Sequence, residues 1–313
     1  MELMPPHAPN VIEFKSATKI YKSLLGRSVT AVEDFSLQVV EGEVLGIAGP
    51  NGAGKSTLIS LLLGYIRPTT GSVTIAGMQP RTYVEKNGIG YLSELMTINP
   101  GWTAESALAR FATLAAVPSR DVRGRVDAVI EQLGIGEHRA KKIKALSKGN
   151  LQRLGLAQSL LRDERVIILD EPTHGLDPVW TQRFRDIVES LRRPGRTVII
   201  ASHNLDELQR LADRVVIIDR GRLQRLVRTG YDQTAETAGS YRIAVVQGAD
   251  RMAHLFPDSV DAGGGEFLVP VANVAELNAA IAKAIAEGVL VASVVPARSV
   301  LEQQFREAVG ETS

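Results

Sequence analysis

Cysteine is absent from this sequence of 313 residues. The absence excludes disulfide bonds, thiol catalysis and thiolate metal sites. Charge of one sign is not in excess either, because 36 Lys and Arg residues stand against 35 Asp and Glu, a formal net charge of +1. A chain this close to neutral gives no reason to expect nucleic acid or an anionic membrane surface as its main partner.

Long hydrophobic runs are also missing. The nearest candidate, residues 288–295, is much shorter than the ~20 apolar residues of a membrane-spanning helix and is better interpreted as a buried strand. Residues 1–10 contain several prolines and lack a basic start followed by an apolar core. We therefore expect a flexible N-terminus and no secretory signal, and we expect any work at a membrane to need a separate spanning protein.

The length favours two domains over one. Residues 229–240 are small and polar and predict a linker between them. Residues 241–313 have the pattern of a small α+β domain, in which strands and helices follow in the order β-α-β-β-α-β of a ferredoxin-like unit. This C-terminal domain lacks a cluster of titratable residues, so we expect packing or regulation there and no second active site.

The most informative stretch lies between two apolar runs, after a predicted strand at residues 44–48 and before a predicted helix from Leu58. It has the pattern G-x-x-x-x-G-K-[ST] of a phosphate-binding loop and consists of Gly49, Pro50, Asn51, Gly52, Ala53, Gly54, Lys55, Ser56 and Thr57. Its glycines let successive N–H groups point at an anion, and the positive end of the helix dipole lies at the same place. Lys55 can reach the outer phosphates, and the Ser56 hydroxyl can hold Mg²⁺.

Polar residues end two predicted buried strands farther along the chain. The β-branched run 166–169 ends in Asp170 and Glu171, and the run 197–201 ends in Ser202 and His203. Carboxylates at the tip of a buried strand are costly unless they have a function, and ligands bind at such tips in open α/β sheets. For a lone His, a structural role and a functional role are both open.

Two further features are weaker. Residues 146–150, Leu-Ser-Lys-Gly-Asn, precede a predicted helix, and a Ser cap with a nearby Gly can form a small anion cradle. Tyr21 lies in the predicted connection between strands 11–15 and 35–39, where it is either stacked on a base or simply a partly buried tyrosine. Helices from Ala104 to Leu133, with Thr103 and Ser119 as expected N-caps, form part of a helical insert at about residues 100–150.

Taken in order, these motifs and the Gly175-Leu176-Asp177 loop resemble the ATP-binding subunit of an ABC transporter over residues 11–228. The resemblance implies an α/β fold of the P-loop NTPase class, with a parallel core sheet, an antiparallel β subdomain and the helical insert. The C-terminal stretch 299–305 is similar to tails of ATPases from prokaryotic exporters. The implied function is ATP hydrolysis that powers export through a separate permease.

The resemblance also implies roles for residues. The phosphate loop would bind the phosphates, and Mg²⁺ would be held by Ser56, Glu94 and Asp170. Glu171, His203 and Lys55 would be catalytic, with Glu171 the general base and His203 at the γ-phosphate. Tyr21 would stack on adenine. In a head-to-tail dimer of two copies, Ser147 and Gly149 would cover the partner's ATP and Asp177 would link the two sites.

Four positions depart from the usual pattern of this family. Glu94 and Asn150 stand where Gln is common, Lys148 where a small Gly is usual, and His174 where Ser is common. A carboxylate at position 94 is a harder oxygen ligand for Mg²⁺ than an amide but adds negative charge. These departures leave the acid, the phosphate loop and the His in place.

Other functions remain open at this point. One is a soluble ATPase of the same family that acts on a nucleic acid, ribosome or assembly scaffold, although the near-neutral charge does not favour a polyanion partner. Another is a nucleotide sensor without hydrolysis, which the presence of Glu171 and His203 disfavours. For a transporter subunit, we expect a cytoplasmic protein attached to the inner face of the cell membrane through its permease.

Overall fold

The structure is a computed structural model that describes residues 9–22, 28–229, 239–271, 273–296 and 300–310. Most of the predicted flexible N-terminus and most of the predicted linker lie outside these ranges. The chain divides into two compact units, the first reaching Arg228 and the second beginning at Thr229. Within the described residues, no helix has the length and apolar character required to cross a membrane.

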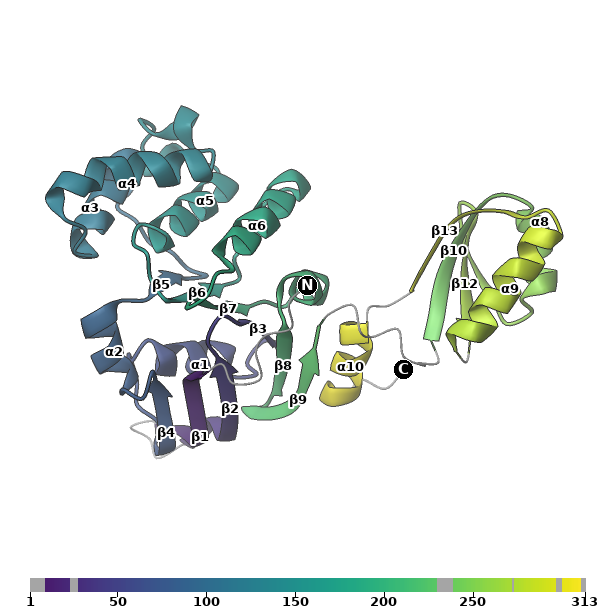
Figure 1. The fold of residues 1–313 in the computed structure, drawn as a ribbon, viewed down its shortest axis with the longest axis horizontal. Helices are drawn as coiled ribbons and strands as arrows, with labels where there is room; N and C mark the ends of the chain where they lie inside the picture. The colour runs from purple at the N-terminus through teal and green to yellow at the C-terminus, as the bar shows by residue number, and fades with distance from the viewer. Residues whose placement is uncertain (1–8, 23–27, 230–238, 272, 297–299, 311–313) are drawn as a thin grey trace. The chain divides into compact units, whose positions relative to one another are not determined.

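A six-stranded sheet forms the centre of the first unit (Figure 1). Its order is β5 (Gly90–Leu92), β6 (Val166–Asp170), β7 (Thr197–Ala201), β3 (Val44–Ala48), β8 (Arg214–Asp219) and β9 (Arg222–Arg228). The first five are parallel and β9 is antiparallel to β8. Every residue of β3, β6 and β7 is buried, as expected for parallel strands covered on both faces. The sheet therefore fixes the strand tips after Ala48, Asp170 and Ala201 along one edge.

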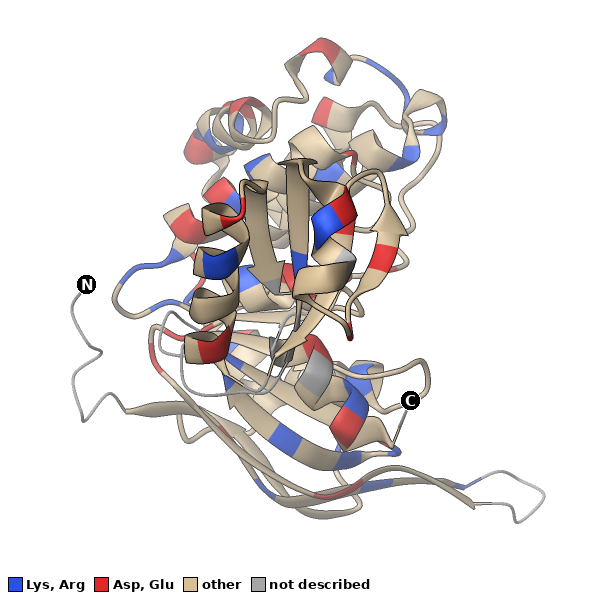
Figure 2. Ribbon diagram, turned by 90° about the vertical axis from the view of Figure 1, so that its right-hand side faces the viewer, with Lys and Arg blue, Asp and Glu red and all other residues tan. Residues whose placement is uncertain are grey.

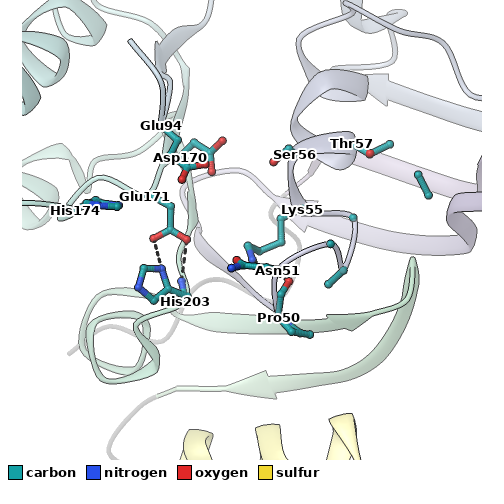
Figure 3. A pocket seen from close by; sticks show the side chains of 14 residues that line it. Pro50, Asn51, Lys55, Ser56, Thr57, Glu94, Asp170, Glu171, His174 and His203 are labelled. Atoms are coloured by element: carbon teal, nitrogen blue, oxygen red, sulfur yellow. Dashed lines mark hydrogen bonds and ion pairs between the residues drawn. The ribbon is translucent and has the colours of Figure 1, made fainter. Parts of the chain in front are cut away.

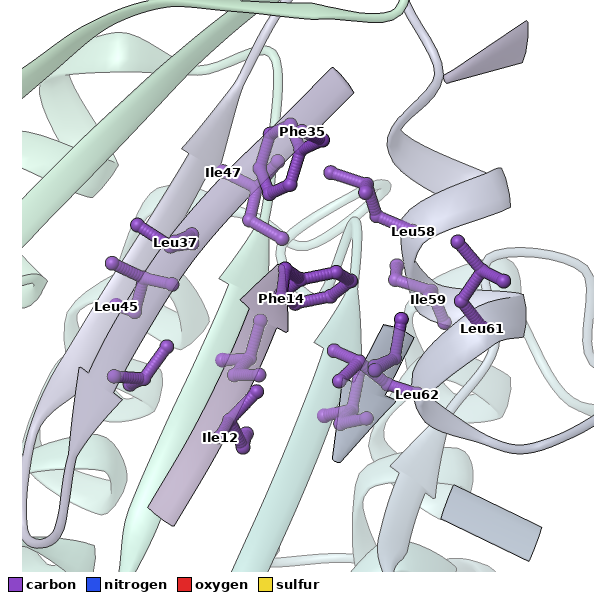
Figure 4. Close-up of a cluster of buried hydrophobic side chains, with 14 of the residues drawn as sticks. Ile12, Phe14, Phe35, Leu37, Leu45, Ile47, Leu58, Ile59, Leu61 and Leu62 are labelled. Carbon is purple, nitrogen blue, oxygen red and sulfur yellow. The ribbon is translucent and has the colours of Figure 1, made fainter. Parts of the chain in front are cut away.

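An antiparallel sheet of three strands has the order β2 (Ser28–Val40), β1 (Asn10–Lys22) and β4 (Thr70–Ile75). The rings of Phe14 and Phe35 meet edge to face with their centroids 5.2 Å apart. They belong to a buried cluster that also contains Leu58 and Leu62 of helix α1 (Lys55–Leu62) (Figure 4). Packing of α1 against this cluster holds the start of the helix, and with it the phosphate loop, in a fixed position.

The remaining helices of the first unit are α2 (Pro80–Asn87), α3 (Ala104–Leu114), α4 (Ser119–Gln132), α5 (Lys148–Ser159), α6 (Pro178–Leu191) and α7 (Leu205–Leu211). Two 3₁₀ turns, Gly136–His138 and Ile143–Ala145, precede α5. Basic and acidic residues are interspersed along these helices (Figure 2). This mixture agrees with the net charge of +1.

The helix caps and strand bounds confirm some of the sequence predictions and contradict others. Thr103 caps α3 in a capping box with Ser106, as expected. The prediction for Ser119 was wrong by one residue, because Pro118 is the N-cap of α4 and Ser119 is its first residue. The prediction that Tyr21 lies in a connection was also wrong. Tyr21 belongs to β1, which is longer than expected because it continues to pair with β2 up to Lys22.

The second unit contains a four-stranded antiparallel sheet of order β11 (Val260–Gly263), β12 (Glu266–Val271), β10 (Gly239–Gln247) and β13 (Leu290–Pro296). Helices α8 (Ala249–Leu255) and α9 (Val274–Ala286) alternate with these strands, which confirms the predicted order β-α-β-β-α-β. Its core includes Ile243, Met252 and Phe267. Helix α10 (Val300–Val309) is divided between the two units.

Candidate functional site

One cavity of about 500 Å³ collects most of the predicted site residues (Figure 3). It is lined by residues 50–57 of the phosphate loop together with Ala31, Glu94, Asp170, Glu171, His174 and His203. The loop follows β3, Asp170 is the last residue of β6 and Glu171 follows it, and His203 comes shortly after β7. The parallel order of these strands therefore brings together motifs that are far apart in the sequence.

The backbone of the phosphate loop needs its glycines. Gly52 and Gly54 have φ angles of +81° and +111°, in the region that side chains disfavour. A Cβ atom on Gly54 would lie only 2.6 Å from the carbonyl oxygen of Ala31. No side chain caps the helix that begins at Lys55. The first N–H groups of α1 are therefore available to an anion in the cavity.

Lys55 brings the positive charge to this end of the cavity. Its Nζ donates hydrogen bonds to the carbonyl oxygens of Gly49 and Pro50, at 2.6 and 3.2 Å. The ammonium group thus lies across the loop whose amides are available to an anion. An ammonium and a set of backbone amides together suit the phosphates of a nucleotide.

Carboxylates gather on the side of the cavity opposite Lys55 (Figure 3). Burial, and then the nearby carboxylates of Glu94 and Glu171, raise the pKa of Asp170 to about 6, while Lys55 acts in the other direction. A cation would relieve this crowding of negative charge. Asp170, Glu94 and the Ser56 hydroxyl are hard oxygen donors, and Mg²⁺ binds through one or two carboxylates together with phosphates and water. These residues therefore fit Mg²⁺.

Glu171 is the most constrained of the carboxylates. Its side chain is buried, with 7% of the residue exposed. Oε1 accepts a hydrogen bond from the backbone N–H of His203 at 3.0 Å, and Oε2 accepts one from Ser202 Oγ at 3.3 Å. Nδ1 of His203 lies 2.8 Å from Oε2 (Figure 3). A fixed carboxylate that lines a phosphate cavity can accept a proton from a water molecule placed there.

His203 and His174 complete this end of the cavity. The imidazole of His203 is 66% exposed, and its Nδ1 contact with Glu171 orients the ring. The two imidazole rings are 6.5 Å apart in an edge-to-face arrangement. The sequence had marked His174 only as a departure from the usual Ser, and it did not predict Ala31 at all. Ala31 acts through its backbone carbonyl oxygen, which lies close to Gly54, and no sequence pattern marks such a contact.

Five of the predicted site residues do not line this cavity, namely Tyr21, Gly49, Ser147, Gly149 and Asp177. Ser147 caps α5 by accepting a hydrogen bond from the N–H of Asn150 at 3.2 Å, as predicted, and its side chain is exposed. Gly149 is in the first turn of the same helix. Asp177 caps α6 through the N–H of Trp180 at 2.9 Å. Tyr21 is 43% exposed, and Lys19 Nζ lies 5.4 Å from its ring centroid.

Helices α5 and α6 meet at a stack of side chains. The guanidinium carbon of Arg153 lies 3.4 Å from the ring centroid of Trp180, and that of Arg183 lies 4.8 Å from it. Arg153 also donates to the carbonyl oxygens of Leu133 and Gly134 at the end of α4. Burial, followed by the charge of Arg183, lowers the pKa of Arg153 to about 10. This stack ties three helices together beside the Asp177 cap.

Comparison with known protein families matches residues 32–174 to the family described as ABC transporter. The chain is 35% identical over 286 residues to the uncharacterized ABC transporter ATP-binding protein YdbJ of Bacillus subtilis. The aligned region covers 88% of this chain and 90% of YdbJ. It is also 35% identical over 221 residues to the methionine import ATP-binding protein MetN of Geobacillus kaustophilus. That aligned region covers 68% of this chain and 64% of MetN.

Among solved structures, the fold is similar to the dimeric post-hydrolysis state of the ATP-binding cassette MJ0796 bound to ADP and Pi. The TM-score is 0.65 at 23% identity, over 70% of this chain and 99% of the other. At that identity the match shows the fold alone. The extended match to YdbJ, together with the phosphate loop and the carboxylates facing it, shows that this chain belongs to the ATP-binding, ATP-hydrolysing subunits of ABC transporters.

Proposed function

We propose that this chain binds MgATP in the cavity described above and hydrolyses it to power export through a separate membrane permease. The observation that carries the proposal is the position of Glu171. It is buried, held by Ser202 and His203, and faces the phosphate loop across a single cavity. A nucleotide sensor without hydrolysis has no need for a carboxylate fixed at this place.

In this proposal the amides of residues 50–57 and the ammonium of Lys55 bind the phosphates. Ser56, Asp170 and Glu94 hold Mg²⁺, which when bound neutralises phosphate charge. Within the part of the chain that the structure describes, no group of three or more His, Asp or Glu residues could hold a metal by itself. That agrees with an ion shared between carboxylates and nucleotide. Tyr21 stacks on the adenine.

Glu171 then acts as the general base for the attacking water. Its carboxylate accepts the proton while the water oxygen attacks the γ-phosphorus in line with the leaving oxygen. Two N–H or O–H donors hold the carboxylate, so it needs little reorganisation when the water arrives. His203, oriented through Nδ1, contacts the γ-phosphate. Positioning and electrostatics therefore supply most of the catalysis.

The proposal also includes a dimer of two copies arranged head to tail. Ser147 and Gly149 do not line the cavity of their own chain, and the exposed start of α5 is free to cover the ATP of a second copy. Asp177 lies between the two sites in this arrangement. One cassette of similar fold, MJ0796, is described as dimeric in two solved structures, which supports the same assembly here.

We further propose that the chain powers outward transport and that the permease holds it at the inner face of the membrane. The helical insert, residues 100–150, would pass the motion of the dimer to the permease. The C-terminal tail at residues 299–305 resembles the tails of exporter ATPases and supports outward transport. MetN, which is named as a methionine import protein, shows that similar cassettes also serve the other direction.

The absence of cysteine allows a direct test of the dimer. Asn51→Cys and Lys148→Cys, introduced together, place one thiol at the phosphate loop and one at the start of α5. We expect ATP to promote an intermolecular crosslink between these thiols. The single variants are the controls. A chain that hydrolyses ATP but never forms this crosslink would contradict the head-to-tail dimer.

A second test addresses the permease. The tagged chain, isolated from membranes under mild detergent, should retain an integral membrane protein. ATP-dependent uptake of that protein's substrate into inside-out vesicles would support export. Uptake into right-side-out vesicles would instead show import, and salt-sensitive retention on RNA or DNA with no membrane partner would favour the soluble alternative.

A further inference from the structure

Gln152 of α5 contacts the loop that carries Glu171. Its amide nitrogen Nε2 donates to the backbone carbonyl oxygens of Glu171 and Pro172, both at 3.0 Å. A primary amide has two N–H donors, so both are used by two successive carbonyl groups of one loop. The side chain is half-buried. It does not line the nucleotide cavity.

The backbone at Glu171 requires such support. Its φ angle is +47°, in the left-handed region that costs free energy for a residue with a side chain. The conformation persists only when the surroundings fix it. The N–H of Glu171 donates to Ala201 O at 2.8 Å, and its carbonyl oxygen accepts from His174 N at 3.2 Å. Gln152 adds a side-chain donor that reaches this carbonyl from helix α5.

Helix α5, which carries Gln152 and has Ser147 as its N-cap, contacts the same loop a second time. A Cβ atom on Gly175 would lie 3.0–3.1 Å from the side-chain carbons of Lys148. One on Gly149 would lie 3.1 Å from Gly175 O. The start of α5 and the loop from Glu171 to Gly175 are therefore packed together without spare room. A displacement of either one is transmitted to the other.

We propose that Gln152 is a positioning residue for hydrolysis: its amide holds the backbone of Glu171 and links the general base to the exposed start of α5. This inference rests on the role proposed above for Glu171. In the proposed dimer, the start of α5 covers the partner's ATP. The link therefore makes the geometry of one general base depend on the nucleotide of the other copy.

The test replaces the amide while preserving the length of the side chain. Gln152→Met removes both donors, and Gln152→Lys restores a donor that can reach the same carbonyls. The matched control is Gln158→Met, a half-buried glutamine two turns farther along α5. ATP turnover, the KM for ATP and the melting temperature are measured for each variant and for Glu171→Gln.

Gln152→Met should lower kcat about 10- to 100-fold, the usual result of a small misplacement of a catalytic group. The KM should change by no more than about threefold, because the phosphate loop is untouched. Gln152→Lys should recover at least part of kcat, and Gln158→Met should match the wild type. Loss of the link should also reduce the cooperativity of turnover in ATP concentration.

The outcomes separate this inference from the proposed function. If Glu171→Gln abolishes turnover and Gln152→Met leaves kcat unchanged, the role of Gln152 is refuted and that of Glu171 stands. A lower melting temperature with normal kcat would show that Gln152 is only structural. If Glu171→Gln itself turns over ATP normally, the proposed role of Glu171 is what fails.

Discussion

Glu171→Gln changes one oxygen into an N–H₂ group and preserves the volume of the side chain. The amide oxygen can accept the hydrogen bond that Oε1 takes from His203 N at 3.0 Å. The amide nitrogen would face Ser202 Oγ and His203 Nδ1, at the present distances of 3.3 and 2.8 Å. Both of those atoms can act as acceptors.

The fold should therefore tolerate the change. We expect the free energy of unfolding to change by no more than about 1 kcal/mol, the net value of one hydrogen bond. The activation barrier should respond much more, because an amide cannot accept the proton. General base catalysis contributes about 10²- to 10⁴-fold. A loss of that size corresponds to about 3–5 kcal/mol in the barrier.

The assay measures phosphate release at saturating ATP, with nucleotide affinity determined separately by calorimetry. Affinity should be retained, since the amides of the phosphate loop and Lys55 are unchanged, and the ATP-bound dimer should be longer-lived. Glu85→Gln, an exposed glutamate of α2 paired with Arg81, is the matched control. A Glu171→Gln protein that keeps more than about a tenth of the wild-type kcat would refute the reasoning.

Three other substitutions have outcomes that follow from local geometry. Gly54→Ala should lower the affinity for ATP, measured by calorimetry, at least about tenfold. The added Cβ would lie 2.6 Å from Ala31 O, and the φ angle of +111° at this position disfavours any side chain. An unchanged affinity would mean that ATP binding does not need this loop conformation. Glu207→Gln breaks a bidentate pair with Arg185 in which the Glu207 side chain is 2% exposed. It should cost about 2 kcal/mol in urea unfolding, with Arg185→Lys less affected. Thr103→Ala removes the N-cap of α3 and should cost about 1 kcal/mol in the same assay, while Thr103→Ser should cost almost nothing.

Much of the site could be predicted from the sequence because its parts have strict local patterns. The phosphate loop needs glycines at fixed positions, and the apolar runs that end in Asp170 and Ser202 are typical of buried parallel strands. The structure places these segments at neighbouring strands of one sheet. The strand at residues 197–201 has the predicted bounds.

Other features depend on contacts between distant segments and could not be predicted. Helix α2 has a largely polar sequence in which only Tyr83 is buried, so it lacks a periodic apolar pattern. The extension of β1 to Tyr21 depends on pairing with Val29 of β2. The backbone of Glu171 has a positive φ angle because of bonds from α5 and β7. No local sequence pattern predicts hydrogen bonds between such distant segments.

The stack of Arg153, Trp180 and Arg183 gives this protein an optical reporter of its own. Indole emission responds to nearby charges, and two guanidinium groups lie within 5 Å of this ring. The chain has two tryptophans, so Trp102→Phe would leave Trp180 as the single indole. Any shift between α5 and α6 during a catalytic cycle should then change the fluorescence of an unlabelled protein.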